Sequence, residues 1–295
     1  MLVESAIWLS KKTKIPSMVV GATIVALATT FPETSVSFFS GLNGAEELAL
    51  NTAIGSMLSN FALVLGISFL VKPVKVSKNN FGGKVVYFLL CTIILFILGI
   101  DGKISLFDAI ILAIVFVLFL IINFCSCKDT DLKPLESLEP AKDIGWPKII
   151  LQFFISAFSI GFGANLMVSN VDKLSQMLNV SEGVFGMFII SVGTNIPELV
   201  TTLTAAKQND AEIGIGNIFG SSIIDATLLI SVSVFACQQK LIFMPIKLLI
   251  ITIIMLVIIT IIIVVPIIKK GTTNRWQGVV LLVLFLIYIM LVYRA

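Results

Sequence analysis

Two carboxylates lie in the middle of apolar stretches of this chain, at Glu33 and Glu198. Each follows a Thr-x-x-Pro sequence, which begins at Thr29 in the first stretch and at Thr194 in the second. A charge placed in hydrocarbon costs several kcal/mol unless a partner compensates it, so an intramembrane carboxylate marks a functional site. Two such carboxylates in the same local sequence predict one site that is built twice.

The two prolines expose backbone oxygens beside the carboxylates. Proline has no N–H and its ring clashes with the preceding turn, so each helix breaks and the carbonyl four residues earlier loses its donor. In a membrane a freed carbonyl must find another donor or a cation. Residues three and four positions before each glutamate share its helical face, and they add the side-chain oxygens of Thr29, Thr30, Thr194 and Asn195.

A second segment of each copy adds further oxygens at a spacing of four residues. Ser56 precedes Asn60 in the first copy, and Ser221 precedes Asp225 in the second. Carboxyl, hydroxyl, amide and carbonyl oxygens with no histidine in the chain disfavour soft metals and suit hard cations, above all Ca²⁺. Several Na⁺ ions would use the same oxygens, and competition for shared carboxylates gives antiport. We expect no cofactor.

Apolar helices must position these groups. Hydrophobic residues make up 58% of the 295 residues and charged residues 13%, which predicts an all-α polytopic membrane protein in a cell membrane. We expect a first half over residues 1–125, a polar cytosolic linker over 126–147 and a second half over 148–295. Apolar runs predict nine spans: 17–39, 48–71, 84–100, 105–124, 148–170, 183–206, 213–236, 246–268 and 277–293.

Lysine and arginine predict the orientation of these spans. With a cytosolic N-terminus, the inner segments carry 15 of these residues and the outer segments carry 5, so the C-terminus is expected outside. The net charge of +3 then reflects topology, and no nucleic acid is expected as a partner. Glu33 lies in the first span and Glu198 in the sixth, so the two copies enter the membrane from opposite sides. Such inverted-topology repeats place a binding site near the midplane.

The copies are offset by 165 residues, and this offset leaves one span without a counterpart. The span over 148–170 would correspond to residues before Met1, and the segment MLVESAIWLS is too short to cross a bilayer. We therefore expect either that the true start lies upstream or that the chain is a nine-span variant.

At these motifs the chain resembles the cation/calcium exchanger superfamily, and specifically its short prokaryotic sodium/calcium exchangers. ATTFPE and VGTNIPE are similar to the G-T-S-x-P-E hallmark of the family's two α-repeats, and AIGSMLSN and IFGSSIID to their second halves. The resemblance implies ten helices, five per repeat, of which the first is missing here. It also implies ligand roles. Glu33 and Glu198 would be shared Ca²⁺/Na⁺ ligands, helped by Thr29 and Thr194; Thr30, Ser56, Asn195 and Ser221 would line flanking Na⁺ pockets; Asn60 and Asp225 would complete the middle.

Departures from the family pattern keep alternatives open. Asn195 replaces a serine, which puts one outer Na⁺ pocket in question, and an aspartate at position 225 also occurs in potassium-dependent members. We expect a Na⁺/Ca²⁺ antiporter and no enzyme, with Ca²⁺, Na⁺ and the lipid bilayer as partners and no obligate protein partner. The alternatives are H⁺/Ca²⁺ exchange, K⁺-dependent exchange, or a transport-inactive form crippled by the missing helix. An ion channel or an intramembrane protease fits the residues less well.

Overall fold

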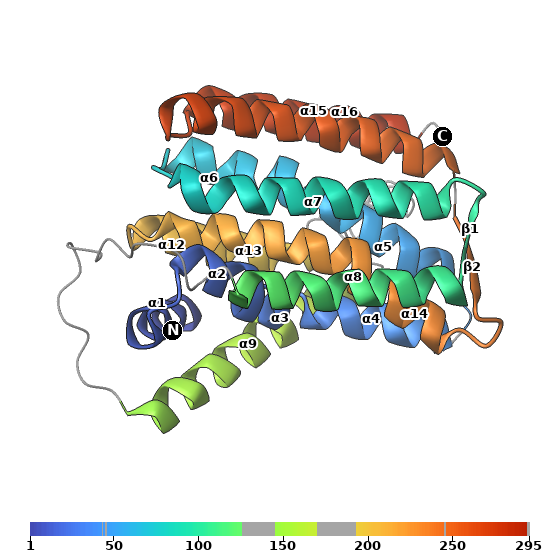
Figure 1. Ribbon diagram of the computed structural model, residues 1–295, viewed down its shortest axis with the longest axis horizontal. Helices are drawn as coiled ribbons and strands as arrows, with labels where there is room; N and C mark the ends of the chain where they lie inside the picture. The colour runs from blue at the N-terminus through green and yellow to red at the C-terminus, as the bar shows by residue number, and fades with distance from the viewer. Residues whose placement is uncertain (43, 45, 126–144, 170–192, 245, 294–295) are drawn as a thin grey trace.

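The structure is a bundle of long helices with two short strands at one end (Figure 1). It is a computed structural model, and it describes residues 1–42, 44, 46–125, 145–169, 193–244 and 246–293. In the first half the elements are α1 (Leu2–Thr13), α2 (Ser17–Val20), η1 (Gly21–Val25), α3 (Ala26–Thr29), α4 (Phe31–Leu42), α5 (Glu46–Ser59), η2 (Asn60–Val64), α6 (Leu65–Val71), α7 (Lys78–Gly99), β1 (Lys103–Ser105) and α8 (Leu106–Cys125).

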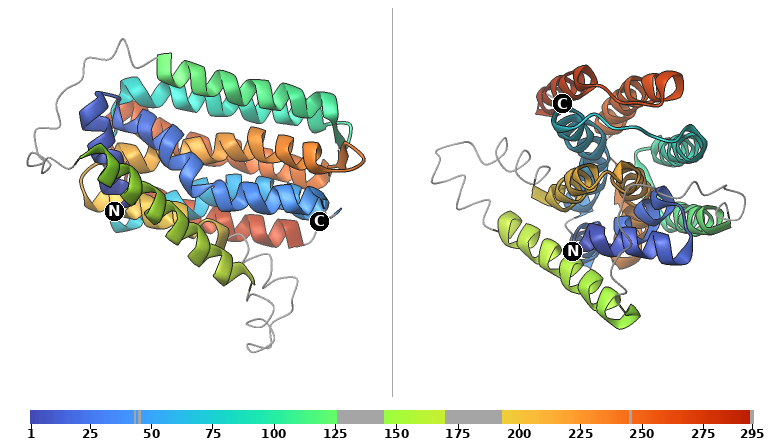
Figure 2. Two further views of the ribbon diagram at one scale, coloured as in Figure 1. Left: turned by 90° about the horizontal axis from the view of Figure 1, so that it is seen from below. Right: turned by 90° about the vertical axis from the view of Figure 1, so that its left-hand side faces the viewer.

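The second half continues with one helix that leans away from the bundle, α9 (Figure 2). Its elements are α9 (Trp146–Ser169), α12 (Ile196–Lys207), α13 (Ala211–Ile224), η4 (Asp225–Leu229), α14 (Ile230–Ala236), β2 (Leu241–Phe243), α15 (Ile246–Lys270) and α16 (Arg275–Tyr293). Labels η1, η2 and η4 mark π-helical turns. Helix α1 packs along α9, where the rings of Trp8 and Trp146 meet edge to face with centroids 4.9 Å apart.

The sequence repeat is also a repeat of secondary structure. The pairs α4 and α12, α5 and α13, η2 and η4, and α6 and α14 begin and end at the same offset of 165 residues. Their packing is reciprocal: α4 packs on α14 while α12 packs on α6, and α8 packs on α14 while α16 packs on α6. The two halves therefore use equivalent elements to hold each other.

Two short β pairings, one at each end, connect helices α7 and α15, which occupy corresponding places in the two halves. Strand β1 follows α7 and pairs antiparallel with β2, which precedes α15; Ile104 lies opposite Ile242. At the other end Lys75, before α7, forms a β-bridge with Thr272, after α15. The start of one helix thus lies beside the end of the other, so α7 and α15 run antiparallel. The expectation of a purely helical chain missed these strands, because three-residue strands carry no periodic pattern.

The number of membrane spans is smaller in the described residues than the nine predicted. Six helices there are long and apolar enough to cross a membrane, or seven if the bent pair Ser17–Thr29 and Phe31–Phe39 counts as one span. The predicted spans over 148–170 and 183–206 run into residues 170–192, which lie outside the described part. The predicted linker over 126–147 also lies outside it, except for residues 145–147. The structure does not confirm a count of nine.

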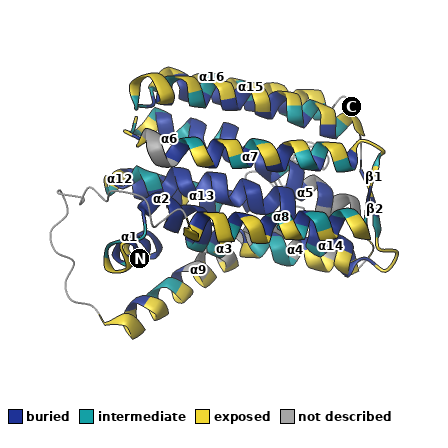
Figure 3. Cartoon of the chain, viewed as in Figure 1, coloured by how far each residue is buried: buried dark blue, intermediate teal, exposed yellow. Residues whose placement is uncertain are grey.

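Burial separates an inner core from outer helices (Figure 3). In the inner spans Ala211–Ala236 and Thr52–Val71, 83% and 72% of the most apolar 18-residue window is buried. In the outer spans Leu106–Cys125 and Arg275–Val292 the buried share of that window is 28% in each. The outward faces of α8, α15 and α16 carry exposed apolar side chains. Such faces suit hydrocarbon, and they leave the polar residues of α5 and α13 in the most shielded part of the molecule.

Helix α15 contains a proline, and a side chain of α16 replaces the backbone hydrogen bond that the proline cannot form. Pro266 has no N–H for the carbonyl of Ile262. The Nε2 atom of Gln277 donates to that carbonyl at 2.8 Å, and its Oε1 atom accepts the N–H of Asn274 at 2.7 Å. Gln277 is fully buried. One side chain therefore caps the start of α16 and satisfies the carbonyl that proline leaves free in α15.

Candidate cation-binding site

The first predicted helix break lies where the proline places it. Helix α3 ends at Thr29, Thr30 leaves helical geometry (φ −86°, ψ 0°), and α4 begins at Phe31. The two parts bend by 47°. The N–H and the hydroxyl of Thr34 both donate to the Thr30 carbonyl, at 3.0 and 2.9 Å. Glu33 then sits in the first turn of α4, with only 2% of its surface exposed.

The second break repeats the first in geometry. Asn195, the counterpart of Thr30, has φ −91° and ψ 6° and precedes α12. The N–H of Leu199 donates to its carbonyl at 2.9 Å, as the N–H of Thr34 does to that of Thr30. Glu198 occupies the first turn of α12 and is 1% exposed. Both glutamates thus lie at the start of a new helix, where the helix dipole favours a negative charge.

The second segment of each half widens into a π-helical turn at its polar residue. Turn η2 begins at Asn60 and η4 begins at Asp225. π-Helical turns inside α-helices are frequent at functional sites. The Nδ2 atom of Asn60 donates to Oδ2 of Asp225 at 3.3 Å, so these two repeat-equivalent residues meet across the halves. The sequence predicted Asn60 and Asp225 as site residues but did not predict the π-helical turns η2 and η4 that begin at them.

Contacts between the two motifs converge on Glu198. The Ser221 hydroxyl donates to its Oε1 atom at 3.5 Å, and the side chains of Thr29 and Thr30, from the other half, also face this carboxylate. Glu33 lies close enough to Glu198 and Asp225 for their charges to act on it. All ten predicted ligand residues are buried, with exposed fractions of 8% or less. The three carboxylates therefore share one shielded region to which both halves contribute.

The region holds buried oxygen atoms that have no hydrogen-bond partner in the described structure. They are Glu33 Oε2, Glu198 Oε2, Asp225 Oδ1, Asn60 Oδ1, Ser56 Oγ and Thr30 Oγ1. A buried polar atom without a partner costs about 1–3 kcal/mol, and more when it is charged. A hard cation coordinated by these oxygens would offset that cost, and sets of six to eight oxygen ligands are what Ca²⁺ takes.

In the described part of the chain, acidic side chains alone do not form a metal-binding cluster. Within the described ranges, no three Asp, Glu, His or Cys residues cluster with metal-site geometry. Hydroxyl, amide and carbonyl oxygens would have to complete any coordination shell. The counterparts of residues 21–27 fall at 186–192, outside the described residues, so the second half of the shell is seen only from Gly193 onward.

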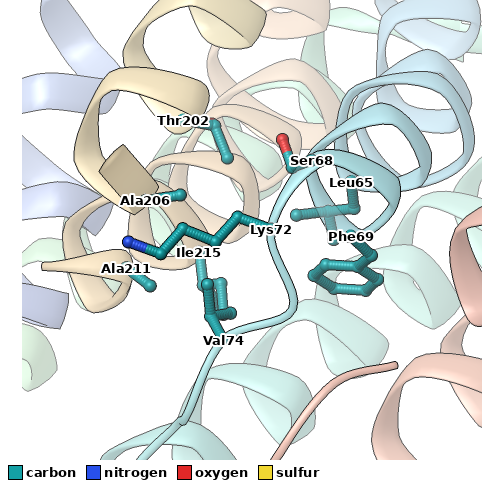
Figure 4. Close-up of a pocket in the computed structure, with 9 residues that line it drawn as sticks. All are labelled: Leu65, Ser68, Phe69, Lys72, Val74, Thr202, Ala206, Ala211 and Ile215. Carbon is teal, nitrogen blue, oxygen red and sulfur yellow. The ribbon is translucent and has the colours of Figure 1, made fainter. Parts of the chain in front are cut away.

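A separate pocket lies between α6 and the α12–α13 pair (Figure 4). Its lining includes Leu65, Thr202 and Ile215, and none of the three carboxylates. The Nζ atom of Lys72, at its edge, donates to Oδ1 of Asn209 at 2.8 Å. An apolar pocket beside a lysine does not suit a cation, so the candidate cation site is the cluster of buried oxygens and does not include this pocket.

Sequence reasoning missed one polar residue at the site, Asn217. Its Oδ1 atom accepts the Thr29 hydroxyl at 3.1 Å, and its side chain is fully buried. Asn217 lies four residues before Ser221 and eight before Asp225, on the same face of α13 and η4. That spacing was available in the sequence and could have drawn attention to it.

Comparisons with known proteins agree with this architecture. The family model for sodium/calcium exchanger protein matches residues 1–125 and 148–294. An uncharacterized membrane protein of Methanocaldococcus jannaschii is 29% identical over 95% of this chain and 88% of its own length. The sodium/calcium exchanger MaX1 of Methanosarcina acetivorans is 25% identical over 99% of this chain and 93% of its own. The solved structure of the sodium-calcium exchanger NCX_Mj, soaked with 10 mM Na⁺ and zero Ca²⁺, superposes with a TM-score of 0.79 at 28% identity, over 98% of this chain and 92% of that one.

Proposed function

The chain belongs to the sodium/calcium exchanger family, and on that premise we propose that it is a secondary active antiporter that exchanges Na⁺ for Ca²⁺ across a cell membrane. Cation/Ca²⁺ exchange is the activity that the family membership supports at the coarser level. The observation that carries the finer proposal is the set of buried, unpartnered oxygens around Glu33, Glu198 and Asp225. Oxygen ligands of this kind suit hard cations and disfavour soft metals.

Charge explains why such a site would exchange its ions instead of leaking them. With the site empty, ionised carboxylates face one another in a shielded region, and occluding that state is costly. Two glutamates neutralise one Ca²⁺, and Na⁺ ions neutralise them as well, so either load lowers the barrier to occlusion. A protein that changes sides only when loaded must carry one ion out for the other that it carries in.

The proposed topology is that of inverted repeats with the site near the membrane midplane. The antiparallel course of α7 and α15, with a β pairing at each end, supports it. So does the reciprocal packing of equivalent helices across the halves. Helix α1 lies at one end of the bundle and α16 finishes at the other (Figure 1), which fits a cytosolic N-terminus and an external C-terminus.

The test is radioactive Ca²⁺ uptake into proteoliposomes that are loaded with Na⁺ and diluted into Na⁺-free buffer. We expect uptake that requires the Na⁺ gradient and that Glu33→Gln abolishes. Glu4→Gln is the matched control, because the Glu4 side chain is 65% exposed and forms an ion pair with the N-terminal amine, away from the buried carboxylates. Its uptake should equal that of the unmodified chain.

Replacing the Na⁺ gradient by a pH gradient, and adding K⁺, separates the rival couplings. Uptake driven by the pH gradient alone would replace Na⁺ by H⁺ in the proposal, and uptake that requires K⁺ together with Na⁺ would make the exchanger potassium-dependent. No uptake under any gradient would overturn the transport proposal and favour a transport-inactive form.

A further inference from the structure

Besides the Asn60–Asp225 contact, a hydrogen bond between Thr29 and Asn217 joins the two halves beside the site. The Thr29 hydroxyl, at the end of α3, donates to Oδ1 of Asn217 on α13 at 3.1 Å. A second acceptor lies in its own helix, the Ala26 carbonyl, at 3.3 Å. The Nδ2 atom of Asn217 is buried and meets no partner in the described residues. Thr29 is therefore the one hydrogen-bond partner that the described structure gives to this amide.

The direction of that hydrogen bond matters for a cation ligand. A hydroxyl has one proton and two lone pairs, so it can bind a cation only if its proton points elsewhere. Thr29 also faces the Glu198 carboxylate, and an ionised carboxylate is a stronger acceptor than an amide oxygen. If the proton turned toward Glu198, it would enter the space that a bound cation needs. Asn217 gives the proton a neutral acceptor on the other side.

Close helix packing holds the amide in place. Flanking Asn217, Gly216 and Gly220 let α13 approach so near that an added Cβ would lie 2.3 Å from the Met18 carbonyl oxygen and 2.2 Å from the Ala22 carbonyl oxygen. Because the two helix backbones pack so closely, the short asparagine side chain of Asn217 reaches Thr29 directly. Backbone packing therefore sets the geometry of the pair, and the amide has little freedom to turn away.

The arrangement is not repeated by residue type in the other half. The counterpart of Asn217 is Thr52, and the counterpart of Thr29 is Thr194. In the second motif the Thr194 oxygen instead accepts from Nδ2 of Asn195 at 3.5 Å. The two motifs therefore differ in the residue that lies opposite the asparagine of α13: Thr52 stands in the first half where Asn217 stands in the second.

We propose that Asn217 is a positioning residue for cation binding: it accepts the Thr29 proton across the two halves and so presents the lone pairs of that hydroxyl to the transported ion. This inference rests on the proposed function, and it assigns to Asn217 no direct contact with the ion. Loss of the acceptor should weaken cation binding by about fivefold to tenfold, the effect of one hydrogen bond. The maximal rate should change little.

The experiment is a double-mutant cycle with Asn217→Leu, Thr29→Val and the combined variant, measured as the KM for Ca²⁺ and the maximal uptake rate in proteoliposomes. Asn217→Leu is expected to raise KM and to leave the maximal rate within about twofold. The two changes should be non-additive, because each removes the same hydrogen bond.

Asn123→Leu is the matched control, since it removes a buried amide from the peripheral helix α8. It should leave KM unchanged. Additive effects in the cycle, or a fall in maximal rate at constant KM, would show that Asn217 only supports the fold and would overturn the inference.

Ca²⁺-induced thermal stabilisation in detergent separates this inference from the proposed function. If the unmodified chain does not exchange Na⁺ for Ca²⁺ but is stabilised by Ca²⁺, and Asn217→Leu needs more Ca²⁺ for the same effect, the inference stands and the exchange proposal fails. If the unmodified chain exchanges and the cycle is additive, only the inference fails. If Ca²⁺ neither moves nor stabilises the chain, both fail.

Discussion

Gly220→Ala is the sharpest test of how the halves approach each other. A Cβ at this position would lie 2.2 Å from the oxygen, 2.6 Å from the carbonyl carbon and 2.7 Å from the Cα of Ala22. All three atoms belong to the backbone of η1, so no side chain can rotate out of the way. Since Cβ contacts under 3.0 Å are essentially never seen, α13 and η1 must separate by at least 0.8 Å.

The size of the effect follows from that displacement. Overpacking of a tight contact costs typically about 1–3 kcal/mol, and a rigid backbone contact belongs at the upper end. Alanine returns about 1 kcal/mol of helix propensity. The net loss of unfolding free energy should be about 2 kcal/mol. A separation of this size would also lengthen the Thr29–Asn217 hydrogen bond, now 3.1 Å, beyond bonding distance.

Thermal unfolding in detergent and uptake in proteoliposomes measure the two consequences. Gly82→Ala is the control, because nothing lies within 4 Å of a Cβ at that position in α7. It should raise stability slightly and leave uptake unchanged. Gly220→Ala should unfold at lower temperature and lose about two orders of magnitude in uptake, as misplacements near 1 Å can cause. Equal stability and uptake in the two variants would refute the close approach of α13 and η1.

Two further predictions concern buried polar groups outside the site. Gln277→Leu should lower the unfolding free energy by about 1–3 kcal/mol. Adding Pro266→Ala to that variant should recover part of the loss, because an alanine N–H can donate to the Ile262 carbonyl. Thermal unfolding of the single and double variants measures both effects, and equal losses with and without Pro266 would contradict the prediction. Burial raises the pKa of Asp210, which accepts the Ser17 hydroxyl at 2.8 Å, so the folded state keeps a proton that the unfolded state releases and stability falls as pH rises through that window. Asp210→Asn should therefore melt above the unmodified chain at neutral pH, with the difference closing as pH approaches the ordinary carboxyl pKa of about 4; a difference independent of pH would contradict the raised pKa.

Much of the fold could be predicted from the chain because its signals are local. Pro32 and Pro197 predict helix breaks, and the breaks lie at Thr30 and Asn195. Apolar length predicts the spans, and six of them agree with the described helices to within four residues at either end. These features depend on the missing N–H of proline and on the thickness of a bilayer, both of which act on one segment at a time.

What the sequence could not predict depends on contacts between segments far apart. The π-helical turn at Asn60 begins where that side chain meets Asp225, 165 residues away. The strands around Ile104 and Ile242 exist only because two loops of different halves lie together. No window of sequence contains both partners of such a pair, so periodicity and propensity give no sign of it.

Asn217 shows that comparing the two sequence repeats does not find every polar residue of the candidate site. Comparing the copies selected pairs such as Ser56 with Ser221 and Asn60 with Asp225, but it did not select the pair of Thr52 and Asn217. Yet the backbone break, the helix starts and the π-helical turns are shared by both halves, so the shared features alone would give a site with two equal sides. Thr52 opposite Asn217, and Asn60 opposite Asp225, make the sides unequal in charge and in hydrogen bonding. Under the proposed exchange of ions of different charge, this inequality would let the two sides prefer different ions, because identical pockets would bind each ion with equal preference on both sides.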